Sequence, residues 1–142
     1  MLNRFYVDNI INTALAEDIN YIDVTTDNLL QDGDVSEAYF VAKDSGILCG
    51  IDVAARVFDL AGGNVEKEIL LKDGAPIKKG DYIAFFRGSA KTLLKGERTA
   101  LNLIQHMSGI ATAANECVKL VEGTNALSLI HISEPTRHAQ IS

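Results

Sequence analysis

The most regular apolar pattern of the chain lies within residues 89–122. Its apolar residues recur at spacings of three, four and seven, as on one face of an amphipathic helix: Leu94, Leu101, Ile104, Ala111, Val118 and Val121. Ser89 has a side chain suited to the N-cap of this segment. Gly109 lies in a run of small residues, and glycine inside a helix costs about 1 kcal/mol relative to alanine. Gly109 therefore marks a break or a close contact, and we expect two helices that meet near residues 107–109.

The first part of the chain also has helical spacing. Residues 2–16 predict an amphipathic helix that ends near Glu17. Thr26 has the side chain of an N-cap residue, so a short second helix carrying Leu29 and Leu30 is expected after it.

The middle of the chain alternates between strand and helix patterns. Residues 36–48 are rich in β-formers around a turn at 44–46, which predicts a hairpin. Residues 50–61 have helical spacing and end at two glycines. The remaining expected elements are a strand at 65–71, turns at 73–74 and 78–81, and a strand at 82–86. Together, these helices and strands predict an α+β fold, an α/β sandwich in which helices pack on a small antiparallel sheet.

Polar side chains on the long helical segment are the candidates for function. Arg98, Asn102 and His106 are spaced four apart, so they share one face of the helix. Glu97 falls on the apolar stripe, where it either needs a partner or sits at the margin. The three polar residues form either a solvated face or a binding face, and spacing alone leaves both open.

Composition narrows the class of protein. The chain has a net charge of −6, 47% hydrophobic and 23% charged residues, as in globular proteins. The negative charge argues against a nucleic-acid or anionic-membrane surface. Cys49 and Cys117 lack metal-ligand spacing and suggest buried free thiols in a reducing compartment. There is no apolar run of membrane-spanning length and no signal-peptide pattern, so we expect a cytoplasmic protein.

Two strings of residues change this picture. The first is GERTALNLIQHMSGIAT at residues 96–112, which resembles the signature of the quinolinate phosphoribosyltransferase family, also called carboxylating nicotinate-nucleotide pyrophosphorylase. The second is EDINYIDVTT at residues 17–26, which is similar to a family pattern of an acidic pair, then Asp, an apolar residue and two threonines. Ile22 stands where the family usually has glycine, which affects the local turn.

The resemblance implies a function. The family makes nicotinate mononucleotide from quinolinate and phosphoribosyl pyrophosphate, with loss of carbon dioxide and with Mg²⁺ bound to the donor. It implies that Arg98 reaches across a homodimer or higher homo-oligomer interface to the quinolinate of the partner subunit, and a guanidinium suits a carboxylate through two parallel hydrogen bonds. His106 lies where many relatives have another basic residue, so it is the second candidate for substrate binding. The resemblance places the catalytic residues and the Mg²⁺ ligands in an α/β barrel, so no metal ligand is expected here.

The resemblance extends to about Thr124 and then stops. Residues 125–142 read NALSLIHISEPTRHAQIS and lack the family's Thr-Arg-Lys-Thr motif. Within them, SLIHISEPTR at residues 128–137 resembles a translated sequencing adapter, and the alternative is a genuine divergent tail. We therefore expect an N-terminal domain at 1–108, the start of a truncated barrel domain at 109–126 and a non-native, disordered tail at 127–142. His131 and His138 are accordingly not interpreted as metal ligands. Such a fragment is expected to be inactive alone and to self-associate through the uncovered stripe of its last helices.

Two alternatives come from other classes of protein. Residues 72–86, KDGAPIKKGDYIAFF, resemble the strand-turn-strand of biotinyl and lipoyl carrier-like β-domains, which are binding modules. Neither Met1 nor Met107 flanks a lysine in the way those carriers require. The other alternative, a purely structural or interaction domain, leaves the two family-like strings unexplained.

Overall fold

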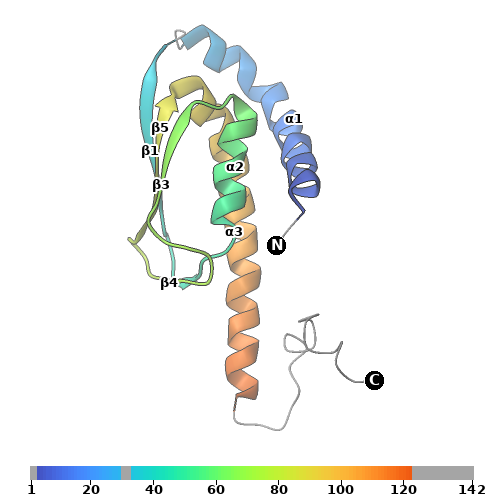
Figure 1. Cartoon of the computed structure of the whole chain (residues 1–142), viewed down its shortest axis with the longest axis vertical. Helices are drawn as coiled ribbons and strands as arrows, with labels where there is room; N and C mark the ends of the chain where they lie inside the picture. Colours follow the sequence, from blue (N-terminus) through green and yellow to red (C-terminus); the bar gives the residue numbers. More distant parts are fainter. Residues whose placement is uncertain (1–2, 30–32, 123–142) are drawn as a thin grey trace.

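The protein is built in layers, with a sheet on one side and helices on the other (Figure 1). The computed structural model describes residues 3–29 and 33–122, and for residues 19–29 it describes the backbone alone. A three-stranded antiparallel sheet has the order β1-β5-β3, with β1 at Val35–Val41, β5 at Tyr82–Ser89 and β3 at Val65–Ile69. Helices α2 (Ile51–Ala61) and α3 (Ala90–Val121) cover one face, and α1 (Arg4–Leu29) packs outside them. The α+β sandwich that the sequence predicts is confirmed.

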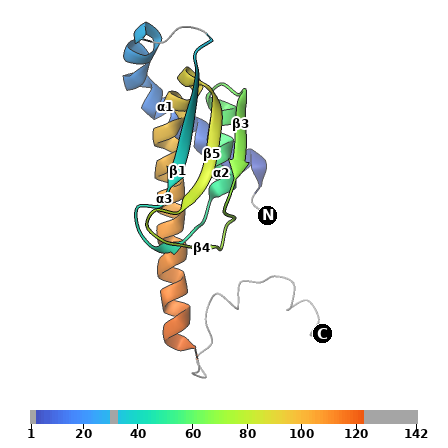
Figure 2. The same ribbon diagram turned by 90° about the vertical axis from the view of Figure 1, so that its left-hand side faces the viewer.

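A second, two-stranded sheet lies near one end of the larger one (Figure 2). It pairs β2 (Gly46–Ile47) with β4 (Pro76–Ile77) in antiparallel register. Figure 2 also shows the larger sheet in front of α2 and α3, so its opposite face carries no helix in the described part of the chain. Because successive side chains of a strand point to opposite faces, β5 has buried residues on the helix side and half-exposed or exposed ones on the open side.

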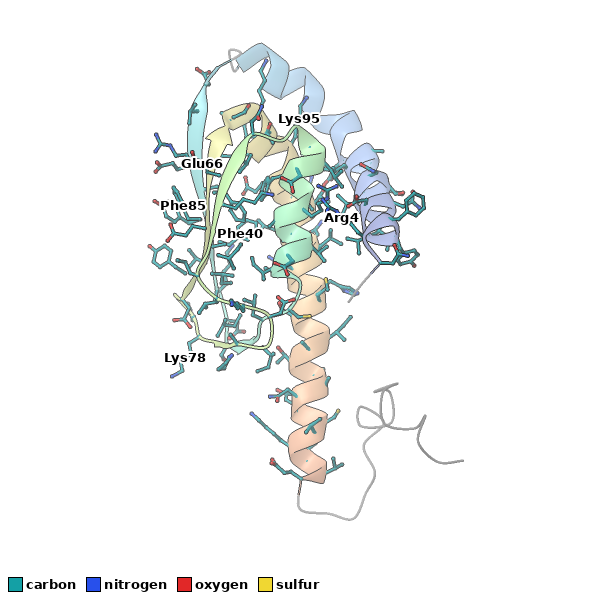
Figure 3. All side chains as sticks on the ribbon, in the orientation of Figure 1. Arg4, Phe40, Glu66, Lys78, Phe85 and Lys95 are labelled. Carbon is teal, nitrogen blue, oxygen red and sulfur yellow. The ribbon has the colours of Figure 1, made fainter. Side chains whose placement is uncertain are left out.

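The core centres on three phenylalanines from three elements. Phe40 of β1, Phe58 of α2 and Phe86 of β5 are all at most 4% exposed. The ring centroid of Phe86 lies 4.9 Å from that of Phe40 and 4.7 Å from that of Phe58. Figure 3 shows Phe40 on the helix side of the sheet and Phe85 on the open side. Aromatic pairs at such distances contribute about 0.5–1.5 kcal/mol beyond their buried area.

Helix α3 reaches this cluster through a glycine. A Cβ atom placed on Gly96 would lie 2.8 Å from Cδ1 of Phe58 and 3.0 Å from its Cε1. Only a residue without a side chain lets the α3 backbone approach the ring so closely. Leu93, Ala100 and Ile104 complete the buried face of the helix.

The sequence interpretation of α3 needs two corrections. The helix is continuous through Gly109, so the predicted break is absent; one glycine is a small cost in a helix of 32 residues whose first half packs on α2. Leu94, predicted on the core stripe, is 46% exposed, and the buried face is rotated towards Gly96 and Ala100. These small residues carry little hydrophobic signal although they make the closest contacts. Ser89 does occupy the N-cap position, but its side chain makes no capping hydrogen bond.

The predicted end of the first helix is also wrong. Helix α1 runs past Glu17 to Leu29, so Thr26 lies inside a helix instead of capping one. Residues 4–29 contain no glycine or proline that would stop the helix. Leu30 lies outside the described residues.

The predicted hairpin at residues 36–48 is wrong as well. Strand β1 pairs with β5, and β2 pairs with β4, so the bend at 44–46 carries the chain from one sheet to the other. The helix predicted at residues 50–61 is confirmed, with Gly50 at its N-cap and Gly62 after its end. The two predicted strands are present, but β3 ends at Ile69 and β5 continues to Ser89. The turns at 73–74 and 78–81 are confirmed, the second by a hydrogen bond from the Asp81 amide to the Lys78 carbonyl oxygen at 3.0 Å.

One ion pair joins the outer helix to the sandwich. Nε and Nη2 of Arg56 each donate to a different carboxylate oxygen of Asp8 at 2.9 Å, and both side chains are about one quarter exposed. Asp59 lies 3.5 Å from Nη1 of Arg56 and also pairs with Lys67. The hydrogen bond from Arg56 lowers the pKa of Asp8 below its usual value of 3.8, and the same contact raises the pKa of Arg56. The pair therefore fixes α1 on α2 through a two-point, charge-assisted contact.

We predict opposite effects for one substitution at two glycines of α3. Gly96→Ala should lower the free energy of unfolding by about 1–3 kcal/mol, because the new methyl group meets the Phe58 ring. Gly109→Ala should raise it by about 0.5–1 kcal/mol, because a Cβ there meets nothing and alanine favours the helix. Urea unfolding of both variants checks this, and equal shifts in the same direction would contradict the packing described for Gly96.

We also predict a pH-dependent role for Asp8. Because its pKa is lower in the folded state than in the unfolded chain, its charge stabilises the fold above the unfolded pKa of about 3.9, and this contribution disappears as the pH falls through the folded pKa. Asp8→Asn should therefore destabilise the protein at pH 7, and the difference from the unsubstituted protein should shrink below about pH 4. Unfolding curves measured from pH 7 to pH 2.5 test this; a difference that stays constant over that range would disprove it.

Candidate functional site

The candidate site lies on the exposed face of α3. Arg98, Asn102 and His106 are all exposed and follow one another at successive turns of this helix. No side chain among those described forms a hydrogen bond or ion pair with the Arg98 guanidinium. Glu97 is exposed too, which settles its position at the margin of the buried face. The Arg98 guanidinium is therefore exposed on the surface of the described part of the chain.

The residue after Arg98 points the other way. Thr99 is 2% exposed, and its Oγ1 donates to Oδ2 of Asp18 on α1 at 3.0 Å. A small cavity of about 140 Å³ lies beside this contact, lined by Ala14, Glu17, Asp18, Thr99, Asn102 and Leu103. The two family-like strings of the sequence thus meet at one hydrogen bond. The sequence interpretation missed this contact, because no spacing pattern connects two residues that are 81 positions apart.

The second half of the α3 signature holds the small sheet. The Ile47 amide donates to Oγ1 of Thr112 at 2.9 Å, and the Cys49 amide donates to Oγ of Ser108 at 3.0 Å. The Ser108 hydroxyl in turn donates to the Cys49 carbonyl oxygen at 3.2 Å. The Leu48 amide points the opposite way, to the Ala75 carbonyl oxygen at 2.9 Å. Two hydroxyls one helical turn apart thereby take the place of a neighbouring strand.

Two glycines make this close contact possible. A Cβ atom on Gly46 would lie 2.6 Å from Oγ1 of Thr112, and one on Gly50 would lie 2.5 Å from Sδ of Met107. Gly50 also has a φ of 91°, which L residues with side chains rarely adopt. The SGIAT part of the signature therefore has a structural role, since Ser108 and Thr112 hold the small sheet. No such structural contact is seen for Arg98 among the described residues.

A separate groove of about 670 Å³ runs between α3 and the residues that follow β1. Leu101, Ile104, Ile77 and Ile83 line it, with Gln105 and Glu116 at its polar edge. Neither Arg98 nor His106 lines this groove. Its walls are largely apolar, and the charged residues Lys43, Asp44 and Glu116 are also among those that line it.

The described residues offer little to a metal ion or to redox chemistry. Among residues 3–18 and 33–122, no three His, Cys, Asp or Glu side chains gather in a way that would hold a metal. These residues therefore do not fit the Mg²⁺ that the family resemblance implies. Both cysteines are unpaired, but Cys117 is exposed and Cys49 only half-buried, so the expectation of two buried thiols is wrong. Burial, with help from Asp73, raises the pKa of Cys49. Within the described part, no helix is long and apolar enough to cross a membrane.

Comparison with known proteins identifies the family. The family model described as "Quinolinate phosphoribosyl transferase, N-terminal domain" matches residues 23–108. The chain belongs to this family. The matched range includes β1 to β5, α2 and the part of α3 that carries Arg98 and Thr99.

Relatives of this quinolinate phosphoribosyltransferase domain cover most of the chain. It is 38% identical over 122 residues to the probable carboxylating nicotinate-nucleotide pyrophosphorylase of Bacillus subtilis, covering 85% of this chain and 42% of that protein. The corresponding probable enzyme of Methanocaldococcus jannaschii is 37% identical over 120 residues, covering 84% of this chain and 41% of that protein. The crystal structure of NadC from Streptococcus pyogenes superposes with a TM-score of 0.80 at 33% identity, covering 85% of this chain and 43% of that one. The chain thus spans about two fifths of the length of the relatives it matches.

The family assignment overturns the carrier-like alternative. Strands β4 and β5 also lie in different sheets, so residues 72–86 do not form the hairpin of a biotinyl or lipoyl carrier. The division of the chain at residue 108 remains a prediction, and α3 runs across that position. Residues 127–142, with the expected non-native tail and His131 and His138, lie outside the described residues.

We predict that Ser108 stabilises the domain through its contact with Cys49. Ser108→Ala should lower the free energy of unfolding by about 1–3 kcal/mol, because a half-buried amide and a carbonyl both lose their partner. Thr13→Ala is the control: its exposed hydroxyl bonds only to the Asn9 carbonyl oxygen of its own helix, and the change should stay within about 0.5 kcal/mol. Urea unfolding and the hydrogen exchange of the Cys49 amide are the measurements. An amide that remains protected in Ser108→Ala would contradict the contact.

Proposed function

We propose that this chain is the N-terminal part of an enzyme that transfers a phosphoribosyl group to quinolinate with decarboxylation. The products would be nicotinate mononucleotide, pyrophosphate and carbon dioxide. The family assignment supports this proposal, and so do relatives named as carboxylating nicotinate-nucleotide pyrophosphorylases. The observation that carries it is Arg98, an exposed arginine with no described partner inside the family-matched segment.

In this proposal Arg98 binds a carboxylate of quinolinate held by a second copy of the enzyme. A guanidinium presents two parallel N–H donors that match a carboxylate, and it stays charged at every physiological pH. Its exposed position supports a contact with another subunit, because the guanidinium pairs with no side chain among those described. His106, two turns further along the same face, is the second candidate for this role. The enzyme would therefore act as a homodimer or a higher homo-oligomer.

The rest of the chemistry would belong to the part of the enzyme that the relatives have beyond this region. Mg²⁺ would bind there with phosphoribosyl pyrophosphate and assist the departure of pyrophosphate. The residues described here would orient the substrate and leave the metal to other groups. The two unpaired cysteines support a reducing compartment such as the cytoplasm.

The 142-residue chain by itself should not form nicotinate mononucleotide. It would lack the groups that position the pyridine nitrogen and bind the donor, and each of these effects supplies several kcal/mol of catalysis. The assay uses purified chain with quinolinate, phosphoribosyl pyrophosphate and Mg²⁺. The positive control is a fusion of residues 1–122 to the part of the Bacillus subtilis relative that follows the aligned region. Product from the chain alone, or none from a folded fusion, would contradict the proposal.

Arg98→Lys in that fusion should weaken quinolinate binding by about 1–3 kcal/mol, because lysine keeps the charge but loses the two-point fork. Arg87→Lys is a matched control, since Arg87 lies on the open face of the sheet, 3.9 Å from Glu37. Isothermal titration of quinolinate gives the binding constants, and urea unfolding checks that both variants keep their stability. Normal binding by Arg98→Lys would make Arg98 an ordinary surface arginine.

A further inference from the structure

The contact between Thr99 and Asp18 holds α3 on the side where α1 packs. Thr99 Oγ1 donates to Asp18 Oδ2 at 3.0 Å, and Thr99 is almost fully buried. It is the side-chain hydrogen bond that links α1 to α3 among the residues whose side chains are described. The opposite flank of α3 is held by Ser108 and Thr112, which bond to residues 47–49. The two flanks are thus fixed at different levels along the helix, and the Thr99 contact lies at the level of Arg98.

The part of the buried face nearest to Arg98 and Thr99 consists of small residues. Gly96 and Ala100 contribute almost no side chain to interlock with α2. Side-chain atoms of a helix lie about 5–6 Å from its axis, so a rotation of about 10° moves them by about 1 Å. A displacement of about 1 Å in a substrate-positioning group can reduce the rate about a hundredfold. A hydrogen bond that fixes the rotation of α3 beside Arg98 therefore matters for any ligand that Arg98 binds.

We propose that Asp18 and Thr99 form a positioning pair that holds Arg98 and Asn102 in the orientation that binds the carboxylate substrate. The role rests on the proposed function. Asn102 takes part because it shares the exposed face with Arg98 and lines the small cavity beside Asp18. Neither Asp18 nor Thr99 needs to touch the substrate, so both act through the orientation of the helix. This gives a reason why Thr99 of the first string and Asp18 of the second occur in one chain.

The alternative is a role in stability alone, and a matched pair of substitutions separates the two. Thr99→Val and Thr112→Val each remove one hydroxyl from the same helix and keep the shape of the side chain. Thr112 accepts from the Ile47 amide and donates to the Ser108 carbonyl oxygen at 2.7 Å, far along the helix from Arg98. Both variants should lose stability, but only Thr99→Val should disturb Arg98. Thr99→Ser keeps the hydroxyl and serves as the rescue.

The experiment uses the fusion of residues 1–122 to the remainder of the Bacillus subtilis relative. Steady-state kinetics give KM for quinolinate, KM for phosphoribosyl pyrophosphate and kcat for each variant. Thr99→Val should raise KM for quinolinate about tenfold and change KM for the donor by less than twofold. Thr112→Val should leave both values within twofold, and Thr99→Ser should restore the quinolinate value to within threefold. Asp18→Ala removes the acceptor of the same hydrogen bond and should change the quinolinate KM as Thr99→Val does. If Thr99→Val does not fold, Asp18→Ala provides the test in its place.

Each outcome decides the question. A quinolinate KM that is unchanged in both folded variants, Thr99→Val and Asp18→Ala, would overturn the positioning role. An equal rise in Thr112→Val would also overturn it, because the effect would then follow stability alone. If the folded, unsubstituted fusion formed no product, the proposed function itself would fall and this role with it, which is a different result from an active fusion with indifferent variants.

Discussion

The packing of α3 against the Phe58 ring is the constraint on which the other contacts depend. Gly96 brings the helix backbone to within van der Waals distance of a ring that also touches Phe86, and this fixes the distance between α3 and α2. At that distance Ser108 and Thr112 reach the backbone of residues 47–49, and Thr99 reaches Asp18. A larger residue at position 96 would push the helix outwards and lengthen all of these hydrogen bonds together. One missing side chain thus sets the geometry of both flanks of the helix.

The sequence predicted the middle of the chain better than its ends, for physical reasons. Between residues 50 and 89, glycines and alternating apolar residues marked the helix and two of the strands, although the strand ends differ and the short strand β4 was not predicted. Helices α1 and α3 were each predicted as two pieces. In α1 no glycine or proline ends the helix near Glu17. Thr26 therefore lies within one continuous helix and does not cap a second one. In α3 the close packing of the first half supports a glycine that local propensity counts as a break. The pairing of the strands could not be predicted from the sequence either. The turn-like residues 44–46 indicate a bend, but they do not show which strands pair with each other.

For the candidate site, the spacing of Arg98, Asn102 and His106 predicted one shared face, and the three residues do share it. Spacing did not show which face of the helix is buried, because Gly96 and Ala100 carry little hydrophobic weight. It also gave no hint of Asp18, which lies 81 positions away from Thr99. The family signature therefore combines two kinds of residue. Arg98 faces outwards and is available for a ligand, whereas Thr99, Ser108 and Thr112 face inwards and hold the helix that carries it.

The hydroxyl contacts of α3 have a consequence for the behaviour of the small sheet towards other molecules. Strand β2 and the residues that follow it have two edges. One edge pairs with β4, and on the other the Ile47 and Cys49 amides bond to Thr112 and Ser108. An edge whose amides are already satisfied cannot serve as a template for a strand from another chain. The helix thus protects a very short strand from intermolecular pairing without adding a strand of its own. Loss of these hydroxyls would therefore leave the Ile47 and Cys49 amides without these partners as well as weaken the fold.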